Sequence, residues 1–406
     1  MTPKTWIVVP AALLAVSAQA QLLSTPPTQT SAGVETQTEA LFQDAAEYAR
    51  HYQVTTAEAV QRLLAQEESV GIIDRLTAPY HERLAGIVLE HRPAYRFVVL
   101  LAGTDPVTDT TINVGGLRVP VVFRTGAPAS RDRLLAAITV HQEEIRDALP
   151  HPPGVGVDAR SGTLIVIVRG QDVAADGADT WGARLTKIAG LPVHVGSWDE
   201  IDENFAVEGG GRLVGSDADG RRFVCTAGFV VTDGVRTGIT TAAHCPDMIR
   251  YVEPDGKSVP LDLVGAWGAR YQDVQIHTGA EPLEPLFWVD KARTLPRTVT
   301  SWRNRTSTRV GDFVCHRGER TGYSCSEVAF VDFAPPGDLC AGPCTPTWVA
   351  VRGPDCGSGD SGGPVFLRTI AFGMLKGASS TADGVCRLYY YMSTDDLPTG
   401  WTLLHR

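Results

Sequence analysis

Apolar residues change their spacing along the chain, and the change divides it into two regions. Over roughly residues 39–200, some apolar residues recur every three or four positions and others form short runs. From Gly211 onward, short apolar runs alternate with Gly, Asp and Pro. A period near 3.6 residues predicts helices, and short runs between turn residues predict strands. We therefore expect a mixed α/β region followed by an all-β region.

Two helices are predicted in the first region. Thr55 and Glu58 form a capping-box pattern ahead of a helix that carries Val60, Leu63 and Leu64. A second helix follows Ser130, with apolar residues at helical spacing at Leu134, Leu135, Ile138, Ile145 and Leu149. Strand-like runs in the same region are Tyr95–Leu101, Pro120–Phe123 and Thr163–Val168.

The second region carries frequent short strand patterns separated by turn residues. The predicted strands include Phe229–Val231, Gly238–Thr241, Leu261–Val264, Phe313–Cys315 and Trp348–Val351. Such a succession is typical of antiparallel barrels or sandwiches.

The amino-terminal residues have the pattern of an export signal. Lys4 precedes an apolar stretch from Trp6 to Val16, and small residues lead to a predicted cleavage after Ala20. The apolar stretch is shorter than the ~20 residues of a membrane-spanning helix, so a membrane anchor is disfavoured. A Ser/Thr/Gln/Pro-rich stretch to about Thr38 then predicts a flexible leader.

A second polar segment lies between the two regions. Ser197–Gly211 contains Asp199, Glu200, Asp202 and Glu203 and ends in three glycines, which predicts an exposed linker. We expect proteolytic processing in this linker, with a new amino terminus near Ala206.

Composition and charge narrow the range of functions. The chain has 406 residues, 43% of them hydrophobic and 20% charged, as in ordinary globular proteins, and is long enough for two to four domains. Its net charge is −10, and residues 206–406, with 20 basic and 22 acidic side chains, carry −2. This balance lacks the excess of basic residues that is typical of nucleic-acid-binding proteins.

All eight cysteines lie between Cys225 and Cys386. An even number confined to one region is the pattern of a cross-linked, exported domain. The chain contains no Cys-x-x-Cys and no His-Glu-x-x-His pattern, so a metal site is disfavoured, and no cofactor is expected.

Two short motifs carry the candidate chemistry: Thr241-Ala242-Ala243-His244-Cys245 and Gly359-Asp360-Ser361-Gly362-Gly363-Pro364. A serine hydroxyl needs a base to take its proton, and a histidine with a pKa near ~6.5 is suited to that task. We assign Ser361 as nucleophile, His244 as base and Asp273, within an alternating apolar run, as the acid that orients the imidazole. The amides of Gly359 and Ser361 are the candidate oxyanion donors.

These motifs resemble those of the chymotrypsin-type serine endopeptidases, in the secreted bacterial branch of α-lytic protease and the streptogrisins. The segment Cys315–Cys325 is similar to a short disulfide hairpin of that branch, and Ile87–Arg96 is similar to its pro-segments. The resemblance implies two six-stranded antiparallel β-barrels in a protease domain at 206–406. His244 and Asp273 would come from the first barrel and Ser361 from the second.

The resemblance also implies a zymogen. An α/β pro-domain within residues 21–205 would assist folding and then occlude the site until it is cleaved. The mature enzyme would be secreted and monomeric, without a membrane anchor, and would act on protein or peptide substrates. The disulfides implied are Cys225–Cys245, Cys315–Cys325 and Cys356–Cys386, which leaves Cys340–Cys344 to close a small extra loop.

The same resemblance places the substrate pocket. Lys376-Gly377-Ala378 stands where relatives commonly have Ser-Gly-Gly in the strand that binds the substrate backbone. Asp355 falls where the floor of the primary pocket is expected. A buried carboxylate there would favour Arg or Lys before the scissile bond, whereas an outward-pointing one would not.

One further contact is expected beside the nucleophile. Asp360 should be buried and ion-paired, because an unpaired buried carboxylate is costly. The resemblance implies an arginine directly after the first cysteine of the small hairpin as its partner; here His316 holds that position, so the adjacent Arg317 is the expected partner.

Three alternatives are weighed against this interpretation. Gly359–Gly363 also fits the Gly-x-Ser-x-Gly pattern of esterases, but that fold needs a histidine after the serine, and only His405 follows. A non-catalytic binding module on a protease fold would need some defect outside the three residues. The first region could also remain as a permanent accessory domain, because the sequence does not show its removal.

Overall fold

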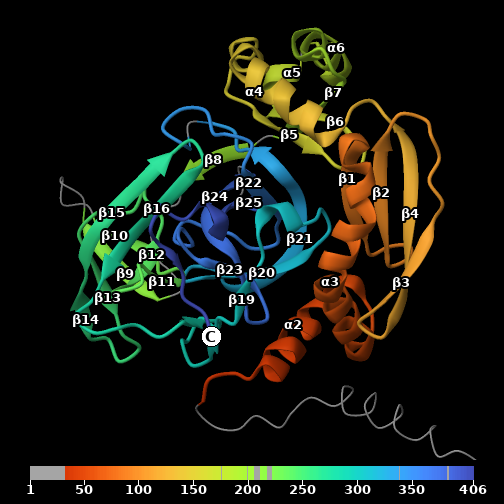
Figure 1. Cartoon of the computed structure of the whole chain (residues 1–406). Helices are drawn as coiled ribbons and strands as arrows, with labels where there is room; N and C mark the ends of the chain where they lie inside the picture. Colours follow the sequence, from red (N-terminus) through yellow and green to blue (C-terminus); the bar gives the residue numbers. More distant parts are fainter. Residues whose placement is uncertain are drawn as a thin grey trace, which may run out of the picture.

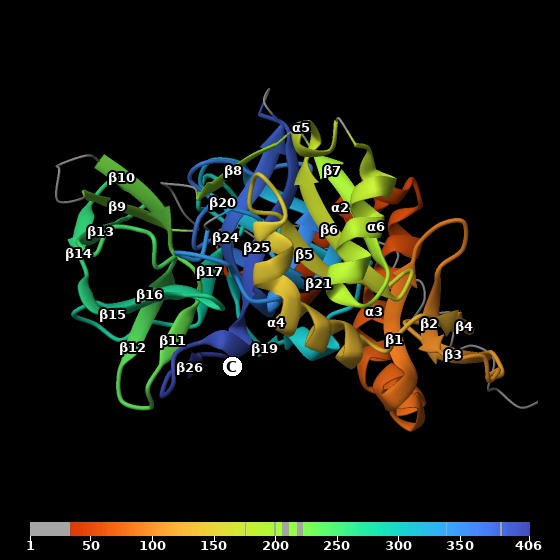
Figure 2. The same ribbon diagram turned by 90° about the horizontal axis from the view of Figure 1, so that it is seen from above.

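The computed structural model describes residues 33–406 except 175, 199, 205–210, 217–221, 338 and 382–383. The predicted signal peptide, most of the leader and the predicted cleavage point near Ala206 lie outside the described residues. Figures 1 and 2 show the first region along one side of the molecule and the strands of the second region filling the rest.

The first region contains the predicted mixture of helices and strands. Its helices are α2 (Gln37–Tyr52), α3 (Thr56–Thr77), η1 (Ala78–Arg83), α4 (Arg131–Asp147), α5 (Gly170–Val173) and α6 (Ala178–Ala189). Its strands are β1 (Leu84–Glu90), β2 (Arg96–Ala102), β3 (Thr110–Val114), β4 (Leu117–Ala127), β5 (Gly154–Asp158), β6 (Thr163–Arg169), β7 (Val193–Trp198) and β8 (Glu200–Asn204).

Both predicted helices are present. The hydroxyl of Thr55 accepts a hydrogen bond from the amide of Glu58 at 3.2 Å, so Thr55 caps α3 as the sequence indicates. Ser130 directly precedes α4. The predicted strands Pro120–Phe123 and Thr163–Val168 fall within β4 and β6, and Tyr95–Leu101 overlaps β2 from Arg96 onward.

The first region is built as two layered units. Strands β1–β4 form one sheet in the order β1-β2-β4-β3, and α3 packs on it through Ala65 and Ile73. Strands β5–β7 form the other sheet, which α4 and α6 cover through Ile138 and Leu185. Each sheet thus buries an apolar face against helices, as a stable layer requires.

The second region consists almost entirely of strands. They are β9 (Arg212–Ser216), β10 (Arg222–Thr226), β11 (Val230–Thr232), β12 (Thr237–Thr241), β13 (Ile249–Val252), β14 (Ser258–Pro260), β15 (Asp262–Ala269), β16 (Gln272–Thr278), β17 (Leu286–Trp288), β18 (Pro296–Thr298), β19 (Ser301–Trp302), β20 (Phe313–Gly318), β21 (Gly322–Ala334), β22 (Trp348–Arg352), β23 (Pro364–Leu367), β24 (Ile370–Thr381), β25 (Cys386–Ser393) and β26 (Thr402–Leu403). Two 3₁₀ turns, η2 (Arg305–Ser307) and η3 (Thr394–Asp396), complete it.

Six of these strands close into one antiparallel barrel. The order β20-β23-β24-β25-β22-β21 returns to its start because β21 also pairs with β20. The expected other barrel is instead two separate ladders, β10-β9-β13-β14 and β15-β16-β12-β11-β26. Leu213, Cys225 and Ile249 belong to an apolar cluster at the first of these ladders, so side-chain packing, rather than a continuous ladder, holds this part together.

The sheet of the first region continues into the closed barrel. Strand β5 pairs with β21 through Val155–Ala334 and Gly156–Phe333. A Cβ at Gly156 would come within 2.6 Å of the Phe333 ring and 2.8 Å of a main-chain oxygen. Glycine at this position therefore lets the two strands approach, which joins the two regions at the backbone level.

Helices α2 and α3 bind the barrel on another side. Leu41, Tyr48 and Leu63 share one buried apolar cluster with barrel residues such as Phe313 and Phe366. The leader begins to contact the second region before α2, because the amide of Glu35 donates to a main-chain oxygen of residue 296 at 2.8 Å. The described end of the expected flexible leader is thus anchored.

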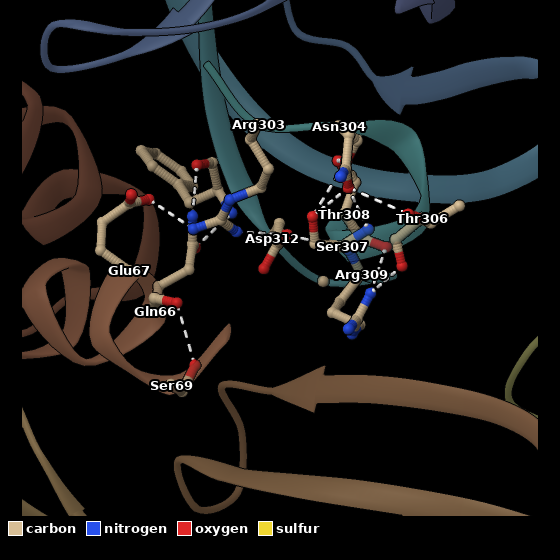
Figure 3. Close-up of polar contacts among 12 residues, drawn as sticks. Gln66, Glu67, Ser69, Arg303, Asn304, Thr306, Ser307, Thr308, Arg309 and Asp312 are labelled. Carbon is tan, nitrogen blue, oxygen red and sulfur yellow. Dashed lines mark hydrogen bonds and ion pairs between the residues drawn. The ribbon is translucent and has the colours of Figure 1, made fainter. Parts of the chain in front are cut away.

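Polar contacts along α3 reinforce this interface (Figure 3). The side-chain amide of Gln66 bonds both main-chain groups of Phe313, at 2.7 and 3.1 Å. Glu67 pairs with the buried guanidinium of Arg303 at 2.7 Å, and Arg303 also pairs with Asp312 at 3.0 Å. Hydrogen bonds between groups that water cannot reach fix the orientation of the helix on the barrel.

The predicted polar linker after β7 is bound to the barrel over the part that the structure describes. Strand β8 lies antiparallel against β24, from Thr381–Glu200 to Gly377–Asn204. The backbone of β8 pairs with β24 along its whole length, which explains why a segment without an apolar pattern forms a strand. Among the described helices, none is both long and apolar enough to cross a membrane.

Candidate active site

The structure brings the three sequence-predicted residues together. His244 follows β12, Asp273 is the second residue of β16, and Ser361 lies in the loop before β23. Nδ1 of His244 is 2.7 Å from Oδ2 of Asp273, and Nε2 is 2.9 Å from Oγ of Ser361. The imidazole thus bridges the carboxylate and the hydroxyl in the order that general-base activation needs.

Asp273 is held as a buried carboxylate. Its Oδ1 accepts a hydrogen bond from the His244 main-chain amide at 3.1 Å, and its side chain is 2% exposed. Burial by itself would raise the pKa of Asp273, but the positive charges of His244 and Lys376 outweigh burial and hold this pKa well below its usual range. The carboxylate therefore stays ionised at neutral pH.

The loop that carries His244 is fixed on two sides. The Cys225–Cys245 disulfide ties the next residue to β10. The side-chain amide of Gln275 in β16 donates to the carbonyls of Ala242 and Cys245 at 2.9 and 3.1 Å. A base held this firmly keeps its distance to the hydroxyl, which favours proton transfer.

Glycines shape the loop around Ser361. Gly359 and Gly362 have φ angles of 124° and 84°, in the left-handed region that favours glycine. A Cβ at Gly362 would approach the carbonyl of Thr226 to 2.4 Å. Thr226 anchors the loop from β10, because its amide donates to the Ser361 carbonyl at 2.7 Å and its hydroxyl to the Gly359 carbonyl at 3.1 Å.

Asp360 is buried as expected, but its partners are different from the predicted one. Its carboxylate accepts hydrogen bonds from the hydroxyl of Thr321 at 2.7 Å and from the amides of Gly357, Arg320 and Thr321 at 2.9–3.2 Å. Burial raises the pKa of Asp360, and these hydrogen bonds oppose the rise. Arg317 pairs instead with Glu319 at 2.8 Å. Main-chain donors leave no mark in a sequence, and the prediction instead followed the arginine that relatives carry in the hairpin that corresponds to Cys315–Cys325.

The predicted pocket residues separate into two groups. Lys376, Gly377 and Ala378 all lie on β24, which passes the nucleophile, and the carbonyl of Lys376 is 3.3 Å from Oγ of Ser361. Asp355 is exposed. The possibility of a buried carboxylate at the floor of a pocket is therefore contradicted at Asp355.

Two features near the site carried no sequence signal. Strand β8 covers the part of β24 that was predicted to bind substrate. An open hollow beside His244 is lined in part by Phe223, Pro246 and Met248. Another cavity lies between the two regions and includes Asp74 and Arg305 in its lining, and none of the three candidate catalytic residues lines it.

All four predicted disulfides are present: Cys225–Cys245, Cys315–Cys325, Cys340–Cys344 and Cys356–Cys386. Two of them flank the candidate site, one beside His244 and one in the segment that leads to Ser361. Cross-links of this number are consistent with an extracellular protein.

No protein-family description matches the chain, and no curated protein matches it. It is similar to solved structures of bacterial chymotrypsin-like serine proteases, which cover about half of it. Thermobifida fusca protease A is 22% identical over 49% of this chain and 99% of that one, with a TM-score of 0.39. A glutamic acid specific serine protease, described as utilizing a histidine triad in substrate binding, is 23% identical over 49% and 100%, with a TM-score of 0.39. Cellulomonas bogoriensis chymotrypsin is 19% identical over 49% and 99%, with a TM-score of 0.36.

Proposed function

We propose that this chain is a secreted serine endopeptidase made as a zymogen. The observation that carries the proposal is the hydrogen-bonded series Asp273–His244–Ser361, with 2.7 and 2.9 Å between the bonded atoms. These three side chains come from separate segments of the chain, and their order and spacing match what hydroxyl activation requires. A structural histidine has no need of a buried carboxylate on one nitrogen and a serine on the other.

The reaction proceeds by acyl transfer. Oγ of Ser361 attacks the scissile carbonyl carbon while Nε2 of His244 takes the hydroxyl proton, giving a tetrahedral oxyanion. Collapse breaks the C–N bond, and His244 returns the proton to the departing amine. Water then attacks the acyl-enzyme, again with His244 as base, and the acid product leaves with Ser361 restored.

The loop around Ser361 supplies the oxyanion donors. We assign this role to the amides of Gly359 and Ser361, whose carbonyls are both fixed by Thr226. The positive φ of Gly359 supports an inward-turned amide at that position. Donors held in place before the reaction lower the barrier by several kcal/mol in total, about 3 kcal/mol each.

The first region acts as a pro-segment over residues 21–205, ahead of a protease domain at 206–406. The support is the position of β8 on β24. Their antiparallel register ends at Asn204–Gly377, one residue from Lys376, so β8 runs toward Ser361 as it occupies the strand edge. A substrate would add to the same edge through backbone bonds. The intact chain therefore blocks its own site, and the bonds just beyond Asn204, near Ala206, are the ones to be cut.

The apolar and polar interface supports a role of the pro-segment in folding. Helices α2 and α3 share a core cluster with the barrel, and β5 extends its sheet. A partner that completes the barrel's core and sheet edge stabilises it while it forms. Export follows from the predicted signal and the four disulfides.

Hydrolysis of a mixed set of unstructured peptides by processed protein tests the proposed activity. We expect internal cleavage by the wild type and a loss of about 10⁴–10⁶-fold in Ser361→Ala and His244→Ala, each first cleaved near Ala206 by added wild type that is then removed, since the three residues act as a unit. Folded, processed wild type without any cleavage would instead support a non-catalytic binding module.

A further inference from the structure

A buried lysine stands beside the triad. Lys376 is 2% exposed and follows the apolar residues Met374 and Leu375 in β24. Its Nζ lies 3.1 Å from Oδ2 of Asp273, the same oxygen that bonds His244. The Lys376 and Asp273 side chains are 3% and 2% exposed, so water screens this ion pair little.

An irregularity in the strand accounts for the direction of this side chain. Leu375 pairs with Tyr391 of β25 and Gly377 pairs with Tyr390, so Lys376 is an extra residue without a partner in that ladder. A bulge of this kind bends the strand and re-aims the side chain of the extra residue. Here it brings the ammonium group of Lys376 to Asp273 on the neighbouring half of the domain.

The rest of the lysine environment is aromatic. Nζ lies 5.0 Å from the ring centre of Trp348, close enough for a cation–π contact. The indole nitrogen of Trp348 donates to the carbonyl of Arg270 at 3.1 Å, which fixes the ring near the start of β16. An ammonium group with an apolar wall and a single carboxylate is costly to bury unless that pair persists.

Two positive side chains dominate the charges that act on Asp273. They are His244 and Lys376. From β25 its amide meets the sulfur of Met392 at 3.3 Å, and β22 presents Trp348 beyond the lysine, and neither side chain titrates. The carboxylate thus already has the ammonium group of Lys376 as a partner before His244 takes a proton. A second positive charge on the imidazole then gains less from Asp273 than it would from an unshared carboxylate.

We propose that Lys376 is a positioning residue that holds Asp273 ionised and aimed at His244, and that its charge sets the pH below which the enzyme loses its base. The inference rests on the proposed function and adds a fourth member to its machinery. Its consequence is a protease that remains active at lower pH than one with a neutral residue at this position, because protonation of the base requires more acid.

Three substitutions separate the charge of Lys376 from its hydrogen bond. Lys376→Gln keeps a donor without charge, Lys376→Met removes both, and Lys376→Arg keeps the charge. The readout is the rate at which a fluorophosphonate labels Ser361 between pH 4 and 9, which needs no knowledge of the natural substrate. A purely structural role would lower this rate without moving its pH profile.

The expected result is a shift, along the pH axis, of the acid side of the profile of labelling rate against pH. In Lys376→Gln and Lys376→Met its midpoint rises by about one pH unit, which makes labelling about tenfold slower at a pH below both midpoints. Lys376→Arg keeps the wild-type midpoint. Unchanged midpoints in both neutral variants would overturn the proposal.

A measurement on the wild type decides the case if the neutral variants do not fold. Only Lys257, Lys291 and Lys376 follow residue 205, so ¹⁵N-lysine NMR of the processed protein gives few signals. Lys257 and Lys291 are exposed. We expect one further ammonium signal, slow to exchange with water, throughout pH 5–9. A third signal that is a neutral amine at pH 7, or an ammonium that exchanges as fast as the other two, would contradict the pairing. Wild type that resists the fluorophosphonate would refute the proposed function instead, and the NMR result would still decide the ion pair.

Discussion

Arg297 and Asp44 form an ion pair in which neither side chain is exposed, with 3.0 Å between Nη1 and Oδ1. Arg297 lies on β18 of the second region and Asp44 on α2 of the first. The same carboxylate accepts the hydroxyl of Tyr323 at 2.6 Å, and the same guanidinium also pairs with Glu35 at 2.6 Å. A single acidic residue of the proposed pro-segment therefore binds several groups of the proposed protease.

Removing this carboxylate should destabilise the intact chain. In a Ser361→Ala background, which lacks the proposed nucleophile, we expect Asp44→Ala to lower the free energy of unfolding by about 3 kcal/mol, because it removes one of the two carboxylates that compensate the buried guanidinium of Arg297. Urea denaturation measures the effect.

Asp74→Ala is the matched control for that experiment. Asp74 also pairs across the interface, with Arg309, but its side chain is 49% exposed. Because water screens this half-exposed carboxylate, its loss should lower the free energy of unfolding by less than the loss of Asp44 does. Equal losses from the two substitutions would show that burial of the Asp44 pair does not matter.

The interface should weaken in acid because of His91. Its Nδ1 faces the hydroxyl of Tyr48 at 2.7 Å and its Nε2 faces the carbonyl of Gly311, in the second region, at 2.6 Å. Burial lowers the pKa of His91 to about 4, below the ~6.5 of an unfolded chain. Between these values the unfolded state binds more protons, so stability is fully present above about pH 6.5 and is lost as pH falls toward 4.

The His91 contribution can be isolated by substitution. Between pH 7 and 4 the free energy of unfolding of the Ser361→Ala protein should fall by about 3 kcal/mol more than that of its His91→Gln derivative. Binding of one proton over ~2.5 pH units contributes a free energy of this size. Equilibrium urea unfolding at several pH values gives the comparison. His81→Gln, at an exposed position, should follow the parent, and a His91→Gln curve that also follows it would exclude this role.

Asp355 should not determine specificity. Because its carboxylate is exposed, Asp355→Ser should leave the ratio of kcat/KM for Arg- and Phe-containing peptides unchanged within about twofold. A selective loss of Arg cleavage would mean that this carboxylate reaches the substrate after all.

Those parts of the fold and site that depend on local side-chain patterns could be predicted. The cap at Thr55, the helix after Ser130 and the short strands follow from propensity and spacing, and the grouping of His244, Asp273 and Ser361 follows from residue type together with chain order. The disulfide pairs were predicted from the family resemblance that these motifs indicated.

Features that depend on backbone contacts or distant pairing could not be predicted. Strand β8 is polar, and only the free edge of β24 makes it a strand. The partners of Asp360 are mostly amides, which every residue has. The burial of Arg297 depends on Asp44, about 250 positions earlier in the chain, and no local pattern links the two.

The intact mass of the secreted protein, with and without a fluorophosphonate, tests the central claim most directly, with Ser361→Ala as the control. The proposed function predicts a wild-type species that begins near Ala206 and gains one adduct, and a Ser361→Ala species that retains the first region and gains none. Wild type that keeps the first region and stays unlabelled, or an adduct of equal size on Ser361→Ala, would contradict it.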